Sequence, residues 1–217
     1  MIKEKVRAIL EELPDGVQLV GAAKTRKAEE ILEAVDAGLA IIGENYVQET
    51  EKVHQMIGDR AKWHMIGHLQ TNKAKKAVQL FDMIETVDSL KLARALHKEC
   101  VKIGKVMPVL IEVNSGEESE KTGVLPAAVP RLIEEMVELE NIEIHGLMTM
   151  GPLSGDPEAS RPFFQRTKAL FEKFKKARLP RGTMTYLSMG MSGSYRIAIE
   201  EGANLVRIGT KIFGPRE

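Results

Sequence analysis

The sequence predicts an α/β fold: a single (β/α)8 barrel of the TIM type with an extra helix at its N-terminus. The first indication is that short apolar runs alternate with longer segments of helical periodicity along the whole chain, which is typical of a parallel sheet. The second is the number of these units. Eight apolar runs in 217 residues leave about 27 residues for each strand and its helix, as a barrel of this type requires. A doubly wound open sheet is the alternative fold, but eight parallel strands lose their exposed edges only when the sheet closes.

Each element of this barrel can be placed on the chain. The extra helix is expected over residues 2–13, before a Pro-Asp-Gly turn. The expected strands are VQLVGAAK (17–24), LAIIGEN (39–45), KWHMIGH (62–68), FDMIETVD (81–88), MPVLIEVN (107–114), IEIHGLMTM (142–150), MTYLSMG (184–190) and NLVRIGTKIFG (204–214). The helices between them are expected at 27–37, 47–57, 72–79, 90–103, 126–139, 158–177 and 195–201. In such a barrel the first strand lies beside the eighth, and all strand C-termini lie on the rim where barrel enzymes build their sites.

Composition limits what the protein can bind. Lys+Arg and Asp+Glu both number 31, so no net charge favours nucleic acid or an anionic membrane. Charges in the opening MIKEKVRAILEEL exclude a secretory signal, and no apolar run reaches membrane-spanning length. The single cysteine, Cys100, cannot form an intramolecular disulfide. We therefore expect a cytoplasmic protein that folds as one domain over residues 1–217, since no shift in composition divides the chain.

Lys24 is the first candidate functional residue, because it ends the run VQLVGAAKT (17–25). In a strand, Val20, Ala22 and Lys24 share one face. Apolar and small neighbours disfavour the ammonium form, and a neutral lysine amine can attack a carbonyl and hold it as a Schiff base. Small neighbours also leave room for a flat ring. The alternative for this stretch alone is a lysine at a strand end that extends to solvent.

Two donor-rich turns are expected beside the first strand. After the seventh run, Ser192 and Gly193 precede a helical segment, so their hydroxyl and backbone N–H groups form an anion site. In the eighth run, Gly209 lets a ligand approach the backbone, and Thr210 adds another N–H and a hydroxyl. The loops after these two strands are the usual phosphate site of this barrel. Arg207 shares a strand face with Gly209, so phosphate, guanidinium and lysine are predicted to converge.

Other polar residues fall near strand ends: Glu44 and Asn45 after the second strand, His64 and His68 around the third, and Asn114 after the fifth. Asn45 or His64 could orient a substituent of a bound ring, and a structural hydrogen bond is the alternative for each. The two histidines lie on either side of a strand end with no cysteine nearby. We therefore expect no metal site.

Taken together, these residues resemble the pyridoxal phosphate homeostasis protein family, whose barrel is related to that of alanine racemase. The matching segments are VGAAKT, IIGENYVQE, WHMIGHLQTNK, EVNSGEESEKTG, HGLMTM, LSMGMSGSY and VRIGTKIFG, spread over nearly the whole chain. The resemblance implies that Lys24 carries pyridoxal phosphate as a Schiff base, that Arg207 faces the pyridine nitrogen and that Asn45 lies within reach of the cofactor. It also implies that the phosphate is held by Ser192, Gly193, Gly209 and Thr210.

Some positions depart from the family's usual pattern. Ala23 stands in place of a common serine, Arg26 and Lys27 where a proline often follows, Tyr46 in place of an arginine, and Ser194 in place of a frequent acidic residue. None of these changes removes the lysine or the phosphate donors. They concern the surroundings of the cofactor.

Three functions are compatible with such a site: a carrier that manages the free level of pyridoxal phosphate without efficient turnover, an amino-acid racemase, and a Schiff-base aldolase. A racemase needs two acid-base groups on opposite faces of the substrate. In alanine racemase the second is a tyrosine of another domain, whereas this chain ends at Glu217. The aldolase does not account for the matching segments, so we favour the carrier. Apo forms of pyridoxal phosphate-dependent enzymes and amino acids are candidate partners.

Overall fold

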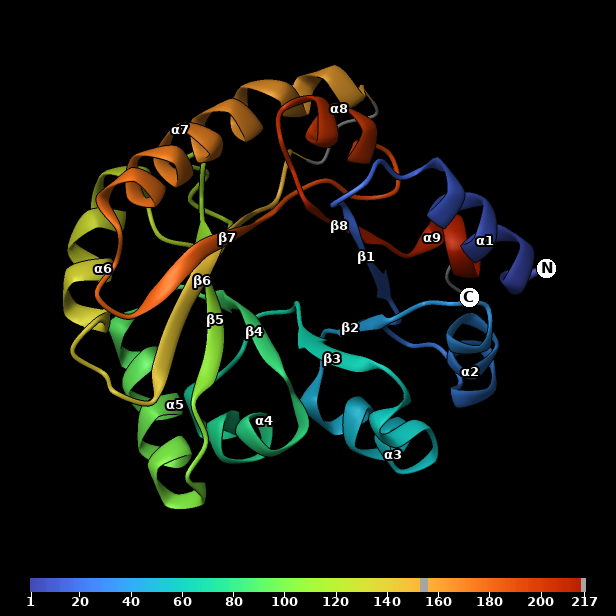
Figure 1. Cartoon of the computed structure of the whole chain (residues 1–217), viewed down its shortest axis with the longest axis horizontal. Coiled ribbons are helices and arrows are strands. Elements are labelled where there is room, and N and C mark those ends of the chain that lie inside the picture. Colours follow the sequence, from blue (N-terminus) through green and yellow to red (C-terminus); the bar gives the residue numbers. More distant parts are fainter. Residues whose placement is uncertain (153–155, 216–217) are drawn as a thin grey trace.

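The computed structural model describes residues 1–152 and 156–215. Eight parallel strands form a closed barrel in the order in which they occur along the chain (Figure 1). They are β1 (Gln18–Ala22), β2 (Ile41–Glu44), β3 (Lys62–Met65), β4 (Met83–Val87), β5 (Met107–Val113), β6 (Ile142–Thr149), β7 (Gly182–Ser188) and β8 (Leu205–Ile208). The barrel expected from the sequence is therefore confirmed, and the open sheet is not formed.

Helices surround the barrel, and α1 is the extra N-terminal helix (Figure 1). The α-helices are α1 (Ile2–Glu12), α2 (Ala28–Asp36), α3 (Val47–Ile57), α4 (Ala74–Leu80), α5 (Leu90–Ile103), α6 (Val129–Met136), α7 (Arg161–Ala177), α8 (Tyr195–Glu200) and α9 (Thr210–Phe213). Short 3-10 helices occur at η1 (Gly58–Arg60), η2 (Thr71–Lys73), η3 (Pro126–Ala128) and η4 (Pro157–Ser160). No helix within the described ranges is long and apolar enough to cross a membrane.

The largest error in the predicted boundaries concerns the last strand. The run at 204–214 was expected to be one strand, but β8 stops at Ile208 and the chain turns into α9. Gly209 has helical backbone angles, and its carbonyl accepts hydrogen bonds from the N–H groups of Ile212 and Phe213, both at 2.9 Å. An apolar run of this length reads equally well as strand or as helix, so periodicity alone could not locate the turn.

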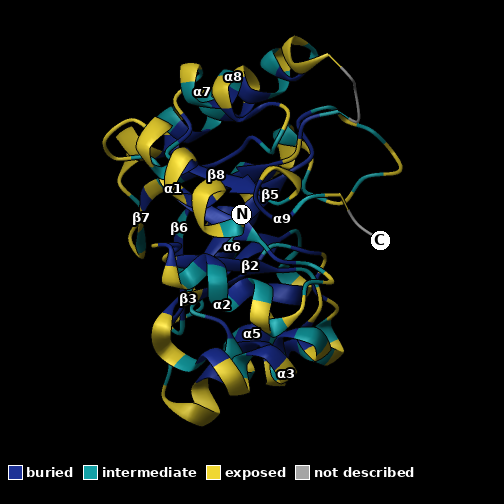
Figure 2. Ribbon diagram, turned by 90° about the vertical axis from the view of Figure 1, so that its right-hand side faces the viewer, coloured by how far each residue is buried: buried dark blue, intermediate teal, exposed yellow. Residues whose placement is uncertain are grey.

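Two layers of apolar side chains define the core. The larger layer lies between the strands and the surrounding helices and includes Leu19, Ala23 and Ile42. The smaller layer alternates with it along the strands and fills the barrel interior. It consists of Val20, Ile41, Met83, Leu110, Met148 and Leu205. Figure 2 shows the buried strands inside and the exposed faces of the helices outside.

The regularity of strand pairing differs around the barrel. β5 pairs with β6 along its whole length, with a register shift beside Gly146. Gly146 has φ 153°, and a Cβ at this position would lie 1.8 Å from the carbonyl oxygen of Tyr186. β7 and β8 share a single paired position, Ser188 with Leu205. There the Asn204 side chain takes over part of the ladder, accepting from the N–H of Leu187 at 2.8 Å and donating to the carbonyl of Thr185 at 2.7 Å.

Candidate functional site

Lys24 lies two residues beyond β1, on the rim formed by the C-terminal ends of the strands. Val20 belongs to the interior layer and Ala23 to the outer one, so the strand presents Lys24 on the interior side, as its alternation predicted. The side chain is half-buried, and its Nζ lies 5.0 Å from the centroid of the Tyr46 ring. Within the described part of the chain it forms no hydrogen bond and no ion pair. The amine is therefore free to react with a ligand.

The two predicted turns lie next to each other on the same rim. The loop after β8 adjoins β1, since Ile208 pairs with Gly21 and a Cβ on Gly209 would lie 3.0 Å from the carbonyl oxygen of Ala22. The loop after β7 reaches the same place, because the Ser192 hydroxyl accepts a hydrogen bond of 3.4 Å from the N–H of Lys211. The topology therefore brings the ends of β1, β7 and β8 together.

These turns contain backbone donors without protein acceptors. Four N–H groups donate to no other described residue: those of Ser192, Gly193, Gly209 and Thr210. The next two N–H groups along the first turn, those of residues 194 and 195, instead donate to the carbonyl of Met191 at 2.9 and 2.8 Å. Unpaired N–H groups that converge on one point form an anion site.

Arg207 lies in the barrel interior below the rim and is only 3% exposed. Its Nη1 donates to the hydroxyl of Ser188, and its Nη2 donates to the carbonyl of Thr149 at 2.9 Å. The Ser188 hydroxyl in turn donates to Glu85 Oε2 at 2.6 Å, and Glu85 Oε1 is 2.7 Å from His64 Nδ1. No described group accepts a hydrogen bond from Nε of Arg207. A ligand nitrogen could therefore accept one.

In this network, burial and the neighbouring charges shift the pKa values of Arg207 and Glu85 in opposite directions. Burial lowers the pKa of Arg207 from its ordinary value, although the charges of Glu85 and Glu112 raise it. Burial alone would raise the pKa of Glu85, but the hydrogen bond and charge of His64 and the charge of Arg207 hold it below its ordinary value. The guanidinium therefore lies among carboxylates that favour its charged form.

The other candidate residues have different positions. Asn45 directly follows β2 on the rim, and His68 lies beyond β3 on the same side, 3.5 Å from Asp88. Asn114 is structural, because its amide donates to the carbonyl of Glu118 at 2.8 Å and accepts from the N–H of the same residue at 3.2 Å. His64 is part of the Arg207 network and does not line the rim, so its structural alternative is the one the contacts favour.

Glu44 was expected to join the site, but it points away from the barrel interior. It is 1% exposed and lines a pocket of about 360 Å³ with Glu49 and Lys52, and its Oε2 has no hydrogen-bond partner among the described residues. Burial, followed by the charge of Glu49, raises its pKa to about 8, although a backbone hydrogen bond from Asn45 opposes this shift. The sequence could have predicted this position, because consecutive residues of a strand face opposite sides. Glu44 and Asn45 therefore cannot both face the barrel interior.

Three polar residues of the interior were not among the predicted site residues: Glu85, Glu112 and Ser188. Each lies on an interior-facing position of a strand, and the first two are carboxylates at 0% and 4% exposure. The available signal was a charged residue within an apolar strand, because an ionised side chain is rarely buried without a partner. No group of three or more metal-ligating side chains occurs in residues 1–152 and 156–215.

Comparison with known proteins identifies the class of this barrel and its site. The family model described as alanine racemase, N-terminal domain, matches residues 1–217. An alanine racemase of Clostridium difficile 630 shares the fold, with a TM-score of 0.82 at 16% identity over 99% of this chain and 56% of that one. The protein is thus a barrel of the alanine racemase N-terminal class.

Relatives of higher identity define the family within that class. A pyridoxal phosphate homeostasis protein of Aquifex aeolicus is 41% identical over 92% of this chain and 87% of that protein. The human protein of the same name is 37% identical over 92% and 77%. PipY of Synechococcus elongatus PCC7942 has a TM-score of 0.92 at 33% identity, covering 99% and 100%, and a second PipY structure has PLP bound. The chain belongs to the pyridoxal phosphate homeostasis protein family.

Proposed function

We propose that this protein binds pyridoxal 5'-phosphate at Lys24 and serves in the homeostasis or delivery of that cofactor, without efficient turnover of its own. The observation that carries the proposal is the free amine of Lys24 beside two turns with unpaired N–H groups. Similarity to proteins named for pyridoxal phosphate homeostasis, and to PipY, which has a structure with PLP bound, supports the same ligand.

The residues of the site match the parts of this cofactor. In the proposal, the N–H groups of the turns after β7 and β8 bind the phosphate, as unpaired backbone donors do at anion sites. They belong to Ser192, Gly193, Gly209 and Thr210. Nε of Arg207 donates to the ring nitrogen, and Asn45 contributes from the rim. When bound, pyridoxal phosphate supplies an aldehyde that reacts reversibly with amines.

The protein's own groups argue for storage of the cofactor over catalysis. Arg207 is held by Ser188, Glu85 and Thr149, and a guanidinium does not give up its proton. A donor of this kind leaves the pyridine nitrogen unprotonated, which weakens the ring as an acceptor of electrons.

A racemase also needs a second acid-base group, and the tyrosines of the chain do not supply one that is held in place. The Tyr195 hydroxyl donates to Glu12 at 2.6 Å and accepts from Lys211 at 2.5 Å, on the outside of the barrel. Tyr186 packs against the interior apolar layer. Tyr46 contacts Lys24 through its ring, is 46% exposed, and its hydroxyl has no hydrogen bond to another described residue. The carrier function therefore remains the better match.

The test is to identify the lysine that holds the cofactor. The protein incubated with pyridoxal phosphate is reduced with borohydride, and its peptides are mapped. We expect the pyridoxyl label on Lys24. Lys24→Ala should lose both the label and the visible absorption and stay folded, because a rim residue contributes little to the core. Lys27→Ala, which changes an exposed lysine close by, should keep both. A label confined to other lysines, or pyridoxal binding as tightly as its phosphate, would refute the assignment.

A further inference from the structure

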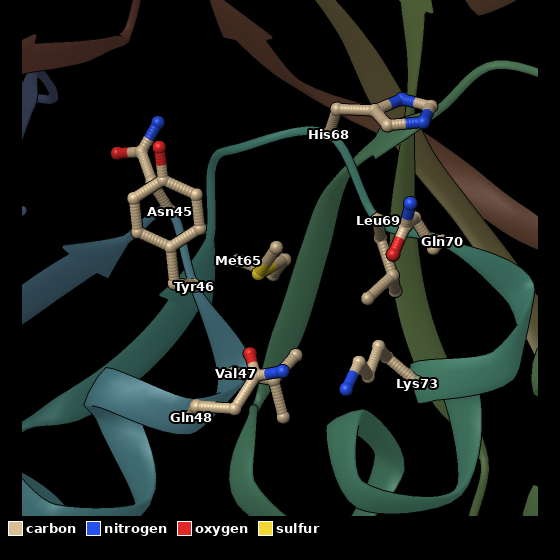
Figure 3. Close-up of a pocket in the computed structure, with 9 residues that line it drawn as sticks. All are labelled: Asn45, Tyr46, Val47, Gln48, Met65, His68, Leu69, Gln70 and Lys73. Atoms are coloured by element: carbon tan, nitrogen blue, oxygen red, sulfur yellow. The ribbon is translucent and has the colours of Figure 1, made fainter.

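A pocket of about 410 Å³ opens on the rim beside the cofactor site, between the start of α3 and η2 (Figure 3). The β2–α3 side contributes Asn45, Tyr46, Val47 and Gln48, and the β3–η2 side contributes Met65, His68, Leu69, Gln70 and Lys73. The second group comes from the segment WHMIGHLQTNK, and only His64 of that segment takes part in the network around Arg207. Five other residues of this segment therefore line the pocket and lie outside that network.

The charge of this pocket is positive. None of its nine lining residues is acidic. Lys73 is half-buried, and its ammonium group has no hydrogen-bond or ion-pair partner among the residues that the structure describes. His68 faces Asp88 at 3.5 Å, and Lys76 of α4 is paired with Glu51 at 2.7 Å. Among the residues that line the pocket, Lys73 is therefore the cation without a carboxylate partner in the described chain.

The remaining lining residues suit an anion attached to an apolar body. The amides of Asn45, Gln48 and Gln70 form no side-chain hydrogen bond within the described chain, so their donors are available. Figure 3 shows Gln48 and Lys73 on opposite sides of the opening, with Met65 above both in this view. Met65 and Leu69 supply the apolar part of the lining, and both are tightly packed, at 1% and 2% exposure. A few converging polar groups on an apolar wall are typical of a small-molecule site.

The Tyr46 ring joins this pocket to Lys24. It lines the pocket, and its centroid is 5.0 Å from Lys24 Nζ. We propose that the pocket binds the carboxylate of a free amino acid through Lys73 and the neighbouring amides, next to the cofactor site that the Tyr46 ring adjoins. The binding of the carboxylate does not depend on the function proposed above.

Three matched probes separate the parts of the proposal: norleucine, pentylamine, which lacks the carboxylate, and hexanoate, which lacks the amine. Their binding to the protein is measured by calorimetry, and the methyl resonance of Met65 reports whether the ligand enters the pocket. We expect norleucine and hexanoate to bind and to shift this resonance, and pentylamine to do neither. Equal binding of pentylamine and norleucine would overturn the proposal.

Variants of Lys73 test the charged contact. Lys73→Met keeps the length of the side chain and removes its charge, so norleucine and hexanoate should bind at least about tenfold more weakly, as expected for a hydrogen bond to a charged group. Lys73→Arg should retain most of the affinity. Lys75→Met, at an exposed lysine of α4 outside the pocket, is the control and should change nothing. Equal losses in Lys73→Met and Lys75→Met would contradict the assignment.

These outcomes can be distinguished from failure of the proposed function. If the protein binds no pyridoxal phosphate at Lys24 but hexanoate binding still depends on Lys73, the carboxylate pocket stands and the cofactor assignment falls. If Lys24 carries the cofactor and no probe shifts the Met65 resonance, the pocket assignment falls alone.

Discussion

The charge of Glu85 should be essential for the stability of the barrel interior, and Glu85→Gln tests this. The substitution keeps the shape of the side chain and an oxygen that can still accept from Ser188. It removes the negative charge that lies 3.9 Å from Nη1 of Arg207, a residue that is 3% exposed. Glu112 is then the remaining carboxylate that affects the pKa of Arg207 within the described structure.

The magnitude follows from the geometry. Two unit charges separated by 3.9 Å attract each other by about 4 kcal/mol at an effective dielectric constant of about 20. Part of this is offset because the variant no longer buries a carboxylate, so we expect a loss of about 3 kcal/mol in the free energy of unfolding. For a chain of 217 residues this corresponds to a fall in Tm of about 6 to 12 °C.

The assay is urea denaturation of both proteins across a range of pH. Because contacts with His64 and Arg207 hold the pKa of Glu85 below its ordinary value of 4.5, its stabilising effect is present above that pH and is lost as the pH falls through the lower folded-state value. The gap between wild type and Glu85→Gln should therefore be widest at neutral pH and shrink in acid.

An exposed ion pair provides the control for this measurement. Glu51→Gln removes the partner of Lys76 on the surface of the molecule and should cost less than about 1 kcal/mol. If Glu85→Gln costs no more than Glu51→Gln at neutral pH, the reasoning about the buried network is refuted.

Two further predictions concern other parts of the barrel. Burial keeps the Glu44 carboxyl protonated up to a pKa of about 8, whereas the unfolded chain ionises above 4.5. The wild type should therefore lose about 5 kcal/mol of stability between those values relative to Glu44→Gln, and urea titrations at acidic and alkaline pH that ran parallel for both proteins would contradict it. Gly146→Ala would place a Cβ 1.8 Å from the carbonyl of Tyr186 at φ 153°, so thermal denaturation should show a loss of more than about 3 kcal/mol; an unchanged Tm would show that the bulge can relax.

The order of strands and helices could be predicted because it depends on local patterns. Apolar runs such as 107–114 are too short for helices and are separated by segments with helical periodicity, and these two signals are sufficient to place a parallel strand. The end of β8 could not be predicted, because Ile212 and Phe213 continue the apolar pattern beyond a turn that only Gly209 marks. Residues 72 and 73 of the 3-10 turn η2 were likewise included in the helix predicted at 72–79, whereas α4 begins at Ala74.

Prediction of the candidate site was limited in a different way. Lys24 and the two turns could be placed on one rim, because the barrel topology fixes where strand C-termini lie. The partners of Arg207 come from β4, β6 and β7, and no local pattern pairs Glu85 with Ser188. Such contacts depend on which interior residues lie at the same level along the barrel axis. This level is set by the register between strands, which the sequence does not give.

The pairing between β7 and β8 is shorter than that between β5 and β6, and this difference bears on the order in which the barrel opens. Residues 187–190 and 204–207 have one registered position, three backbone hydrogen bonds outside the strands and the contacts of the Asn204 side chain, whereas β5 and β6 pair at seven positions. The first pair should therefore separate at a lower free energy. The two phosphate-binding turns of the proposed site lie on either side of this separation, after β7 and after β8. A phosphate that bridges them binds only the closed barrel, so its binding energy adds directly to the cost of opening. Loss of the ligand would then let the barrel open first between β7 and β8, while the other strands stay paired.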